Sequence, residues 1–546
     1  MALIDRRIGV LFIAFVALLG IALARATYLG SVRASSLERA AATQQVSNVV
    51  VPAPRGAITD RNGAELAISQ SADDVVADPY LIKDPVSASA VLSAALRMPR
   101  LTVLAKITKR HTGYVLLAHL VPSALAQAVA NLHVAGINLV PQVRRVYPRG
   151  SEAAQVVGGV HGDGTGSSGI EYEYNNVLKG TNGLRRVVSD ALGQAISIED
   201  PRPTDPGKAV ALTIDSGLQQ EVERVLTQVG STYSPKSATA IAVNPTNGAI
   251  LALANWRSAT ADSSAGPDDL AIGLNYEPGS TFKAITVAGA LQDRLVTPST
   301  PFDVPPVLQV ADRQIHDAED HGYETLSVAN ILKYSSNIGA DLIGMKLGAA
   351  RFNYWVRRFG FGARTGVDLP GEQSGIVLRL SQYSGSSMAN LPFGQGESVT
   401  PMQMVAAYDA IANGGILRPP HVVQSVGGRT QPLPPGHRII SPTTAQELRE
   451  MLRGVFADGG TASGAEIRGY DMAGKTGTAN IAIDGHYSDS AYVASFIGMV
   501  PTDHPRLLVA VVVNQPQGSI YGGSVAAPAF QQIVGWAVPY LGLPTH

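Results

Sequence analysis

A run of uncharged residues near the N-terminus restricts the fold of this chain more than any other feature. Residues 8–24 contain no charged or strongly polar side chain, and an α-helix needs about 20 such residues to cross the hydrocarbon core of a bilayer. Arg25 follows, and its long side chain could reach the interface while the helix continues to Leu29. The sequence therefore predicts a transmembrane anchor over residues 8–29.

The charges beside this run predict its orientation. Arg6 and Arg7 precede it, and positively charged flanks stay in the cytoplasm. We therefore expect a cytoplasmic tail over residues 1–7, a single pass through the plasma (cell inner) membrane and an extracytoplasmic remainder. The alternative is a cleaved signal peptide, because Ala22-Leu23-Ala24 fits a small-x-small cleavage pattern, although the apolar run is longer than a usual signal core.

Composition excludes several classes of function. The chain has 42 Lys and Arg against 43 Asp and Glu, whereas a nucleic-acid partner favours a basic surface. It has no cysteine, so disulfides, thiolate zinc sites and a cysteine nucleophile are excluded. We expect no nucleic-acid partner.

The sequence after the anchor divides at a proline-rich linker, residues 201–207. Residues 30–207 are expected to form one domain, beginning with a helical stalk over residues 30–50. Residues 208–546 are expected to form a second domain of mixed α+β class.

The strands expected in the second domain are short and separated by turns. A hairpin is predicted over residues 238–243 and 249–254, around Asn247-Gly248. Strands over 470–473, 491–499 and 507–513 would form an antiparallel sheet, and a last helix is expected over residues 528–541.

The first chemical element is Ser280-Thr281-Phe282-Lys283. Pro278-Gly279 precedes it and an apolar helical pattern follows, so Ser280 is expected in the first turn of a buried helix. Residues three apart share a helix face, and a lysine kept neutral by burial could activate the serine hydroxyl. A helix-capping serine and a surface lysine fit this short pattern as well.

Two further elements follow along the chain. Ser335-Ser336-Asn337 interrupts two helical stretches, where it could aim a hydroxyl and a carboxamide into a cleft or simply form a turn. In Gly474-Lys475-Thr476-Gly477-Thr478 the small residues allow a ligand to approach the backbone. Lys475 with Thr476 and Thr478 could bind a carboxylate, or Lys475 could be a solvated residue at a strand end.

The three elements together are far more specific than each alone. Ser-x-x-Lys, Ser-x-Asn and Lys-Thr-Gly in this order are the signature of penicillin-binding proteins and serine β-lactamases. The chain resembles the class B penicillin-binding proteins, most closely the septal, cell-division type. Other stretches that support the resemblance are Arg55-Gly56-Ala57-Ile58-Thr59-Asp60-Arg61-Asn62-Gly63, Arg145-Val146-Tyr147-Pro148, Gly169-Ile170-Glu171 and Phe393-Gly394-Gln395-Gly396.

The resemblance implies a fold and an activity. Residues 208–546 would be a penicillin-binding transpeptidase domain, an antiparallel sheet flanked by helices, preceded by an elongated pedestal (dimerisation-type) domain over residues 30–207. The enzyme would be a serine-type D,D-transpeptidase that cross-links peptidoglycan stem peptides during septal cell-wall synthesis and that β-lactams inhibit covalently.

The resemblance also assigns roles to residues. Ser280 would be the nucleophile, Lys283 its base, and Ser335 with Lys475 the route of the proton to the leaving amine. Residues implied to bind substrate are Asn337, Thr476, Gly477 and Thr478, and the backbone N–H groups of Ser280 and Thr478 would form the oxyanion hole. No metal or cofactor is implied, and the implied partner is a polytopic polymerase of the SEDS type with other division proteins.

Several alternatives stay open from the sequence. An elongation-type transpeptidase or a D,D-carboxypeptidase would use the same site. A β-lactamase would not need the anchor and pedestal, a β-lactam-sensing receptor would need more spans or a cytoplasmic effector, and a division scaffold would not need intact motifs. The acidic stretch that contains His316, Asp317, Glu319, Asp320 and His321 could bind a metal, but we expect a solvated loop.

Overall fold

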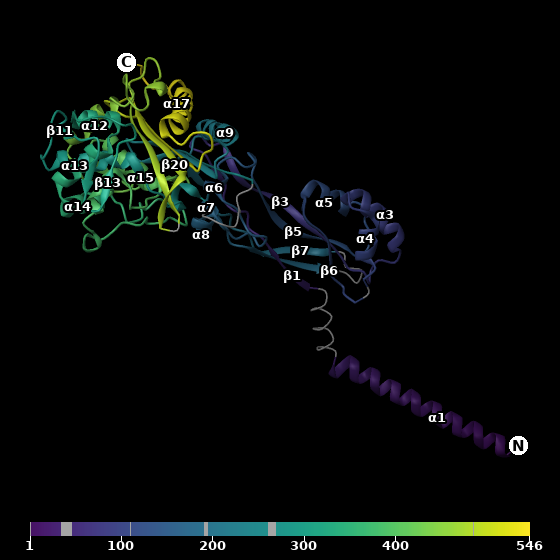
Figure 1. The fold of residues 1–546 in the computed structure, drawn as a ribbon. Coiled ribbons are helices and arrows are strands. Elements are labelled where there is room, and N and C mark those ends of the chain that lie inside the picture. Colours follow the sequence, from purple (N-terminus) through teal and green to yellow (C-terminus); the bar gives the residue numbers. More distant parts are fainter. Residues whose placement is uncertain are drawn as a thin grey trace. The chain divides into compact units, whose positions relative to one another are not determined.

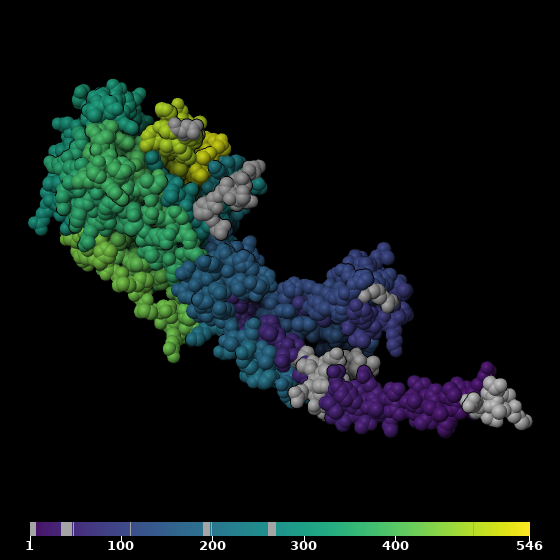
Figure 2. Space-filling model, turned by 90° about the horizontal axis from the view of Figure 1, so that it is seen from below, coloured from purple at the N-terminus to yellow at the C-terminus, as the bar shows by residue number. Residues whose placement is uncertain are grey.

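A computed structural model describes residues 2–33, 46–109, 111–189, 195–259, 269–483 and 485–545. These residues form two compact units. The first unit comprises Met1–Arg55, Ser69–Val146 and Lys179–Gly207, and the second comprises Gly56–Ile68, Tyr147–Leu178 and Lys208–His546. Figure 2 shows the atoms of residues 269–483, coloured teal to yellow-green, gathered in one body.

The first unit begins with helix α1 (Ala2–Thr27), followed by a π-helical turn (Tyr28–Val32). The helical segment Arg7–Val32 is long and apolar enough to cross a membrane. The most apolar part of this segment is not buried against any other described part of the protein. An apolar helix surface of this length that no protein covers is suited to a lipid environment.

The predicted helical stalk over residues 30–50 is wrong for its last part. Residues 46–50 belong to strand β1 (Val46–Val51), which pairs antiparallel with β6 (Gly183–Ser189), and β6 pairs with β7 (Ala195–Arg202). The β-branched valines of β1 fit a pleated sheet better than a helix. Residues 34–45 lie outside the described residues.

The rest of the first unit is a small layer of helices on strands. Most of β3 (Glu65–Ala77) pairs with β4 (Val115–Pro122) and with β5 (Ile137–Val146). Helices α3 (Pro85–Leu96), α4 (Arg100–Ile107) and α5 (Ser123–Ala130) share a core with these strands. This core includes Leu92, Val103, Leu117 and Val129, each at most 1% exposed.

The second unit is built on a five-stranded antiparallel sheet in the order β10-β9-β21-β20-β19. Its strands are β9 (Ser237–Asn244), β10 (Ala249–Arg257), β19 (Ala473–Ile483), β20 (His486–Val500) and β21 (Leu507–Asn514). Strand β19 is at the edge of the sheet, so one row of its backbone groups has no strand partner. The chemical residues Lys475 to Thr478 lie on this edge strand.

Both faces of the sheet are buried, and successive residues of a strand pack into two different cores. In β21, Val509, Val511 and Val513 belong to one core with helices α9 (Ser216–Tyr233) and α17 (Gly522–Tyr540). Leu508, Ala510 and Val512 belong to the other core. Covering both faces explains why residues 507–513 are all apolar. Figure 1 shows α17 and α9 on one side of β20, and α12 (Val328–Tyr334), α13 (Asn337–Leu347) and α15 (Pro401–Ala412) on the other.

The helices of the second core carry Lys283 and Asn337, and Ser280 and Ser335 lie directly at helix ends. These helices are α11 (Lys283–Gln292), α12 (Val328–Tyr334), α13 (Asn337–Leu347), α14 (Ala349–Arg358), α15 (Pro401–Ala412) and α16 (Pro442–Arg453). Nine residues of α11 and all of α15 are buried, so the start of α11 is fixed by tight packing on several sides.

Smaller elements complete the second unit. They include β2 (Ile58–Thr59), α6 (Ala154–Val157), α7 (Gly169–Glu173), α8 (Asn175–Leu178), β8 (Val210–Leu212), β16 (Val423–Val426) and β17 (Arg429–Thr430). Strand β8 pairs with β2 and with β16. Asp215 caps α9 and accepts a 2.8 Å hydrogen bond from Tyr540 Oη, which ties the end of α17 to the start of α9.

The structure confirms the hairpin and the antiparallel sheet and corrects one of its strands. Residues 470–472 are not in a strand; β19 begins at Ala473 and runs to Ile483. The last helix begins at Gly522 rather than at residue 528 and has Pro528 and Pro539 within it.

Candidate active site

Ser280 lies in a 3₁₀ turn (Gly279–Phe282) that leads directly into α11. Gly279 has φ +53°, a conformation that glycine adopts without strain. Its N–H donates to Gly394 O at 2.9 Å, and a Cβ atom at this position would lie 3.0 Å from Thr478 O. The glycine therefore allows the turn that carries Ser280 to lie against the edge strand β19.

Lys283 is the first residue of α11 and is 0% exposed. Its Nζ donates to Asn337 Oδ1 at 2.8 Å, to Ser335 Oγ at 3.3 Å and to the carbonyl oxygen of Ser335. Among the described residues it makes no hydrogen bond with Ser280 Oγ. The two side chains are one helical turn apart, and such contacts commonly tighten only when substrate binds.

Burial lowers the pKa of the Lys283 amine to about 7, against the opposing effect of the Asp317 and Asp341 carboxyl groups. An amine with this pKa is neutral in a large fraction of molecules near neutral pH. Only the neutral form can accept a proton. Lys283 therefore has the burial and the protonation that a general base requires.

The Ser335-Ser336-Asn337 segment forms the junction between α12 and α13. Ser335 has φ +63° and ends α12, and Ser336 caps α13 by accepting from Gly339 N at 2.9 Å. Because the chain reverses here, Ser335 Oγ and Asn337 Oδ1 both reach the Lys283 amine. The alternative of an ordinary turn does not account for these contacts.

Asp317 holds this junction in place. Its carboxylate accepts hydrogen bonds from Ser336 Oγ at 2.6 Å, from Ile338 N at 3.0 Å and from Asn337 N. His316, Glu319 and Asp320 are exposed as expected for a solvated loop, but the Asp317 side chain is only 9% exposed. The loop prediction is wrong at Asp317, because three donors at the start of α13 need an acceptor. It is also wrong at His321, whose side chain is 18% exposed and whose Nε2 lies 3.1 Å from Asp317 Oδ2.

Lys475 is the second buried lysine of the site and is 0% exposed. Its Nζ donates to Ser335 Oγ at 2.9 Å and to the carbonyl and hydroxyl oxygens of Thr476 at 3.2 and 3.3 Å. Burial lowers the pKa of this amine well below its usual value, and the positive charge of Lys283 acts in the same direction. The alternative of a solvated lysine at a strand end is therefore wrong.

Ser335 Oγ lies within hydrogen-bond distance of both lysines. A hydroxyl can donate one proton and accept others at the same time. The Lys283 amine, the Ser335 hydroxyl and the Lys475 amine therefore form a continuous route for a proton.

The other residues of the Lys-Thr-Gly strand have different surroundings. Thr476 Oγ1 is hydrogen bonded to Thr461 Oγ1 at 2.8 Å, and Thr478 Oγ1 accepts from Gly522 N at 3.0 Å. A Cβ atom at Gly477 would lie 2.3 Å from Ser495 Oγ. Of these three residues, Thr478 alone lines the pocket beside Ser280.

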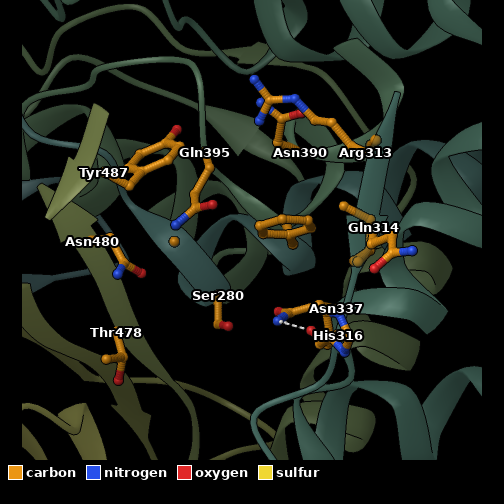
Figure 3. A pocket seen from close by; sticks show the side chains of 14 residues that line it. Ser280, Arg313, Gln314, His316, Asn337, Asn390, Gln395, Thr478, Asn480 and Tyr487 are labelled. Atoms are coloured by element: carbon orange, nitrogen blue, oxygen red, sulfur yellow. Dashed lines mark hydrogen bonds between the residues drawn. The ribbon is translucent and has the colours of Figure 1, made fainter. Parts of the chain in front are cut away.

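The pocket beside Ser280 has a volume of about 370 Å³. Ser280, Asn337 and Thr478 contribute to its wall, and Figure 3 shows their side chains around one opening. The sequence prediction gave no substrate-binding role to the other polar residues of this wall, which are Arg313, Gln314, His316, Asn390, Gln395, Asn480 and Tyr487. Asn480 could have been found, because it lies two residues after Thr478 and so on the same face of the strand.

Asp341, outside the pocket wall, is a further residue that the sequence prediction missed. It lies on α13, is 0% exposed, and neither carboxyl oxygen has a hydrogen-bond partner among the described residues. Burial raises the pKa of this carboxyl group to about 8. Its position four residues after Asn337, on the same helix face, was the available signal.

No group of three or more His, Asp or Glu side chains in the described part of the chain is arranged to hold a metal ion. The acidic stretch around Asp317 is included in this result, because all of its residues are described.

Comparison with known families gives two matches that together cover most of the chain. Residues 238–535 match the penicillin binding protein transpeptidase domain, and residues 50–212 match the penicillin-binding protein dimerisation domain.

Individual relatives match over most of their length. The chain is 32% identical to penicillin-binding protein PbpB of Mycolicibacterium smegmatis, over 97% of this chain and 90% of that protein. It is 33% identical to the peptidoglycan D,D-transpeptidase FtsI of Escherichia coli K12, over 91% and 84% of the two chains. It is also 33% identical to stage V sporulation protein D of Bacillus subtilis, over 95% and 83%.

Solved structures agree with these matches. The crystal structure of penicillin binding protein 3 from Mycobacterium tuberculosis without ligand superposes with a TM-score of 0.70 at 30% identity and covers 91% of this chain and 98% of that one. The complex of the same protein with aztreonam superposes equally well, at 29% identity.

Proposed function

The chain belongs to the class B penicillin-binding proteins, and from that membership we propose that Ser280 is the residue through which it carries out its reaction. The protein is a peptidoglycan D,D-transpeptidase, a serine acyltransferase of the septal type that binds β-lactams. The observation that carries the residue assignment is the convergence of two fully buried lysines on Ser335 Oγ, next to the turn that presents Ser280.

Acylation begins with the neutral amine of Lys283. It accepts the Ser280 hydroxyl proton while Ser280 Oγ attacks the carbonyl carbon of the penultimate D-Ala of a donor peptide. The amide C–N bond then breaks, and the proton passes through Ser335 Oγ to the nitrogen of the departing D-Ala. Backbone N–H groups of Ser280 and Thr478 would hold the oxyanion, an effect of about 3–4 kcal/mol per donor.

The edge strand binds the donor. Asn337 hydrogen bonds a donor amide, and Lys475 with Thr476, Gly477 and Thr478 receives its terminal carboxylate. The low pKa of Lys475 does not oppose this role, because a nearby negative charge favours the protonated amine. An amine of a second stem peptide then attacks the acyl-enzyme, forms the cross-link and restores the Ser280 hydroxyl.

Labelling and product analysis test this assignment. We expect a fluorescent penicillin to label the wild-type protein and not Ser280→Ala, and labelling of that variant would overturn Ser280 as the nucleophile. With donor and acceptor stem peptides and an active polymerase, we expect cross-linked product. Cleavage of D-Ala without any cross-link would instead support a D,D-carboxypeptidase.

We propose the domain limits and the membrane orientation on the same basis. Residues 8–29 would be the anchor, residues 30–207 the pedestal and residues 208–546 the transpeptidase domain, with residues 1–7 in the cytoplasm. The chain has no cysteine, so single cysteines report position without background. A membrane-impermeant maleimide should label Ser31→Cys and not Ala2→Cys in intact spheroplasts, and the reverse pattern would overturn the orientation.

We also propose a SEDS-type polymerase and other division proteins as partners, reached through the anchor and the pedestal. Support comes from the single apolar span and the dimerisation-domain match. Co-purification from detergent should retain the polymerase with the full chain and lose it when residues 1–33 are replaced by an unrelated transmembrane helix. Retention with the replaced helix would exclude the anchor as a docking surface.

A further inference from the structure

The pocket extends well beyond Ser280 toward a hairpin that none of the sequence elements include. Strands β12 (Leu308–Val310) and β13 (Arg313–Ile315) pair around the two-residue turn Ala311-Asp312. Arg313 begins the second strand, is exposed, and lines the pocket. In Figure 3 its side chain and that of Asn390 lie at one edge of the pocket, Thr478 lies at the opposite edge, and Ser280 is between them.

The charge of Arg313 is not neutralised by an acid. Among the described residues its guanidinium has no ion pair and no hydrogen bond. Across the pocket, Glu277 Oε1 accepts hydrogen bonds from Gly396 N at 3.1 Å and from Tyr487 Oη at 3.3 Å, so this acid is bound to groups other than Arg313. An unpaired guanidinium with five fixed donors is suited to a carboxylate from a ligand.

The groups beside Arg313 are also ready to bind a polar ligand. Asn390 Oδ1 is buried and has no hydrogen-bond partner among the described residues, and Gln395 and Gln314 present carboxamides to the same cavity. Burial raises the pKa of the Tyr487 phenol, and the positive charge of Arg313 acts in the opposite direction. The guanidinium therefore lies within electrostatic reach of Tyr487, which faces it across the pocket.

The direction of the donor peptide decides what reaches this edge. On the function proposed above, the terminal carboxylate of the donor lies near Thr478 and the carbonyl to be attacked lies at Ser280. The preceding residues of the donor must then leave the site toward the opposite edge, where Arg313 is located. Stem peptides carry free carboxylates in this part, either on the side chain of the residue before the D-Ala pair or on a γ-linked glutamyl residue one position earlier.

We propose that Arg313 is a specificity-determining residue that binds a carboxylate of the donor peptide upstream of its D-Ala pair. This inference rests on the proposed function, because it requires the donor to be attacked at Ser280. It predicts that the enzyme takes donors with an acidic upstream group in preference to otherwise identical neutral donors.

A matched pair of penicillins tests the inference directly. The acyl side chain of one ends in a carboxylate, and that of the other ends in the corresponding carboxamide. We expect the wild-type full-length protein to be acylated at least about tenfold faster by the carboxylate form, the effect of a charge-assisted hydrogen bond. Arg313→Gln should reduce this rate ratio to near one, and Arg313→Lys should give an intermediate ratio.

The control is Arg429→Gln, which removes an exposed arginine of β17 away from the pocket. It should keep the wild-type ratio. A ratio in Arg313→Gln equal to that of the wild type, or a wild-type ratio near one, would overturn the inference. If neither penicillin acylates the wild-type protein, the proposed function fails and this inference fails with it.

Peptide competitors separate the two sources of the carboxylate. Peptides ending in D-Ala-D-Ala that carry the acid on the preceding side chain, or on an added γ-glutamyl residue, are compared for their ability to slow penicillin labelling. The source that Arg313 binds is the one whose inhibition constant rises at least about tenfold in Arg313→Gln. An equal change in the inhibition constants of both acidic peptides and of a neutral peptide would contradict a specific contact between Arg313 and a carboxylate.

Discussion

The two lysines of the site are buried to the same extent but in different surroundings. Lys283 begins a helix, contacts Asn337 and the junction at Ser335, and lies within the influence of two carboxyl groups. Lys475 lies on an edge strand, bonds neutral oxygens only, and has another amine as its charged neighbour. Burial lowers both pKa values, and the neighbouring acids keep that of Lys283 close to neutrality.

This difference indicates a division of labour. A base must exchange its proton readily at the working pH, and Lys283, with a pKa of about 7, meets that requirement. The pKa of Lys475 is lowered well below its usual value, so its amine takes up a proton most readily when a negatively charged group binds beside it. The surroundings of Lys283 are thus suited to proton transfer, and those of Lys475 are suited to binding the carboxylate of the donor.

The largest expected effect comes from replacing each lysine in turn. Lys283→Met should slow penicillin acylation by about 10³-fold or more, and Lys475→Met by about 10²-fold, because only the first removes the proposed base. Stopped-flow fluorescence gives both second-order rate constants. Lys346→Met, an exposed lysine of α13, should react as the wild type does, and equal losses in the two site variants would contradict the division of labour.

The next effect tests whether the two regions act through one hydroxyl. Ser335→Ala removes the oxygen that both amines contact and should slow acylation by about 10²-fold. If both amines act through the Ser335 hydroxyl, Lys475→Met should slow acylation much less in the Ser335→Ala background than in the wild type. Additive losses in this double-mutant cycle would mean that the two residues act independently.

A smaller effect is expected for the residue that fixes the junction. Asp317→Asn weakens three hydrogen bonds at the start of α13. It should therefore lower the free energy of unfolding by about 1–3 kcal/mol and the acylation rate by about tenfold. Thermal melts measure the loss of stability, and stopped-flow fluorescence measures the acylation rate. The matched control is Asp320→Asn in the same loop, where the side chain is exposed, and a comparable loss there would argue against a specific brace.

The smallest effect concerns pH. Acylation should rise with pH and level off above about 7, because the proposed base, Lys283, can accept a proton only in its neutral form. The Asp341 carboxyl group raises the pKa of Lys283, so Asp341→Asn should move the midpoint of the rate profile to lower pH, by about 0.5 unit. An unchanged midpoint, or a shift to higher pH, would contradict this effect of Asp341 on Lys283.

Much of the catalytic unit could be predicted from local sequence. The apolar run 507–513 and the turn at Asn247-Gly248 gave strands and a hairpin that the structure confirms. The start of β19 was misplaced because Gly474 and Gly477 have low strand propensity, and their conformation depends on pairing with β20. Strand β1 was missed because its partner β6 lies more than a hundred residues later.

The site was predictable to the extent that it resides in short patterns. Helical spacing joined Ser280 to Lys283, but no local signal connects Asp317 with the junction at Ser336 or places Arg313 in the pocket. Those contacts arise when separate segments of the chain pack together. From the sequence, Asp317 is only one member of an acidic stretch. Such a stretch does not distinguish a carboxylate with a structural role from one in a solvated loop.

The most direct test of the account is the position of the covalent adduct. After reaction with penicillin, the wild-type protein is digested and the modified peptide is sequenced by mass spectrometry. The prediction is a single penicilloyl group on Ser280, formed at a rate that Lys283→Met lowers by about 10³-fold or more. An adduct on Ser335 or on any other residue, or one that forms equally fast without Lys283, would contradict it.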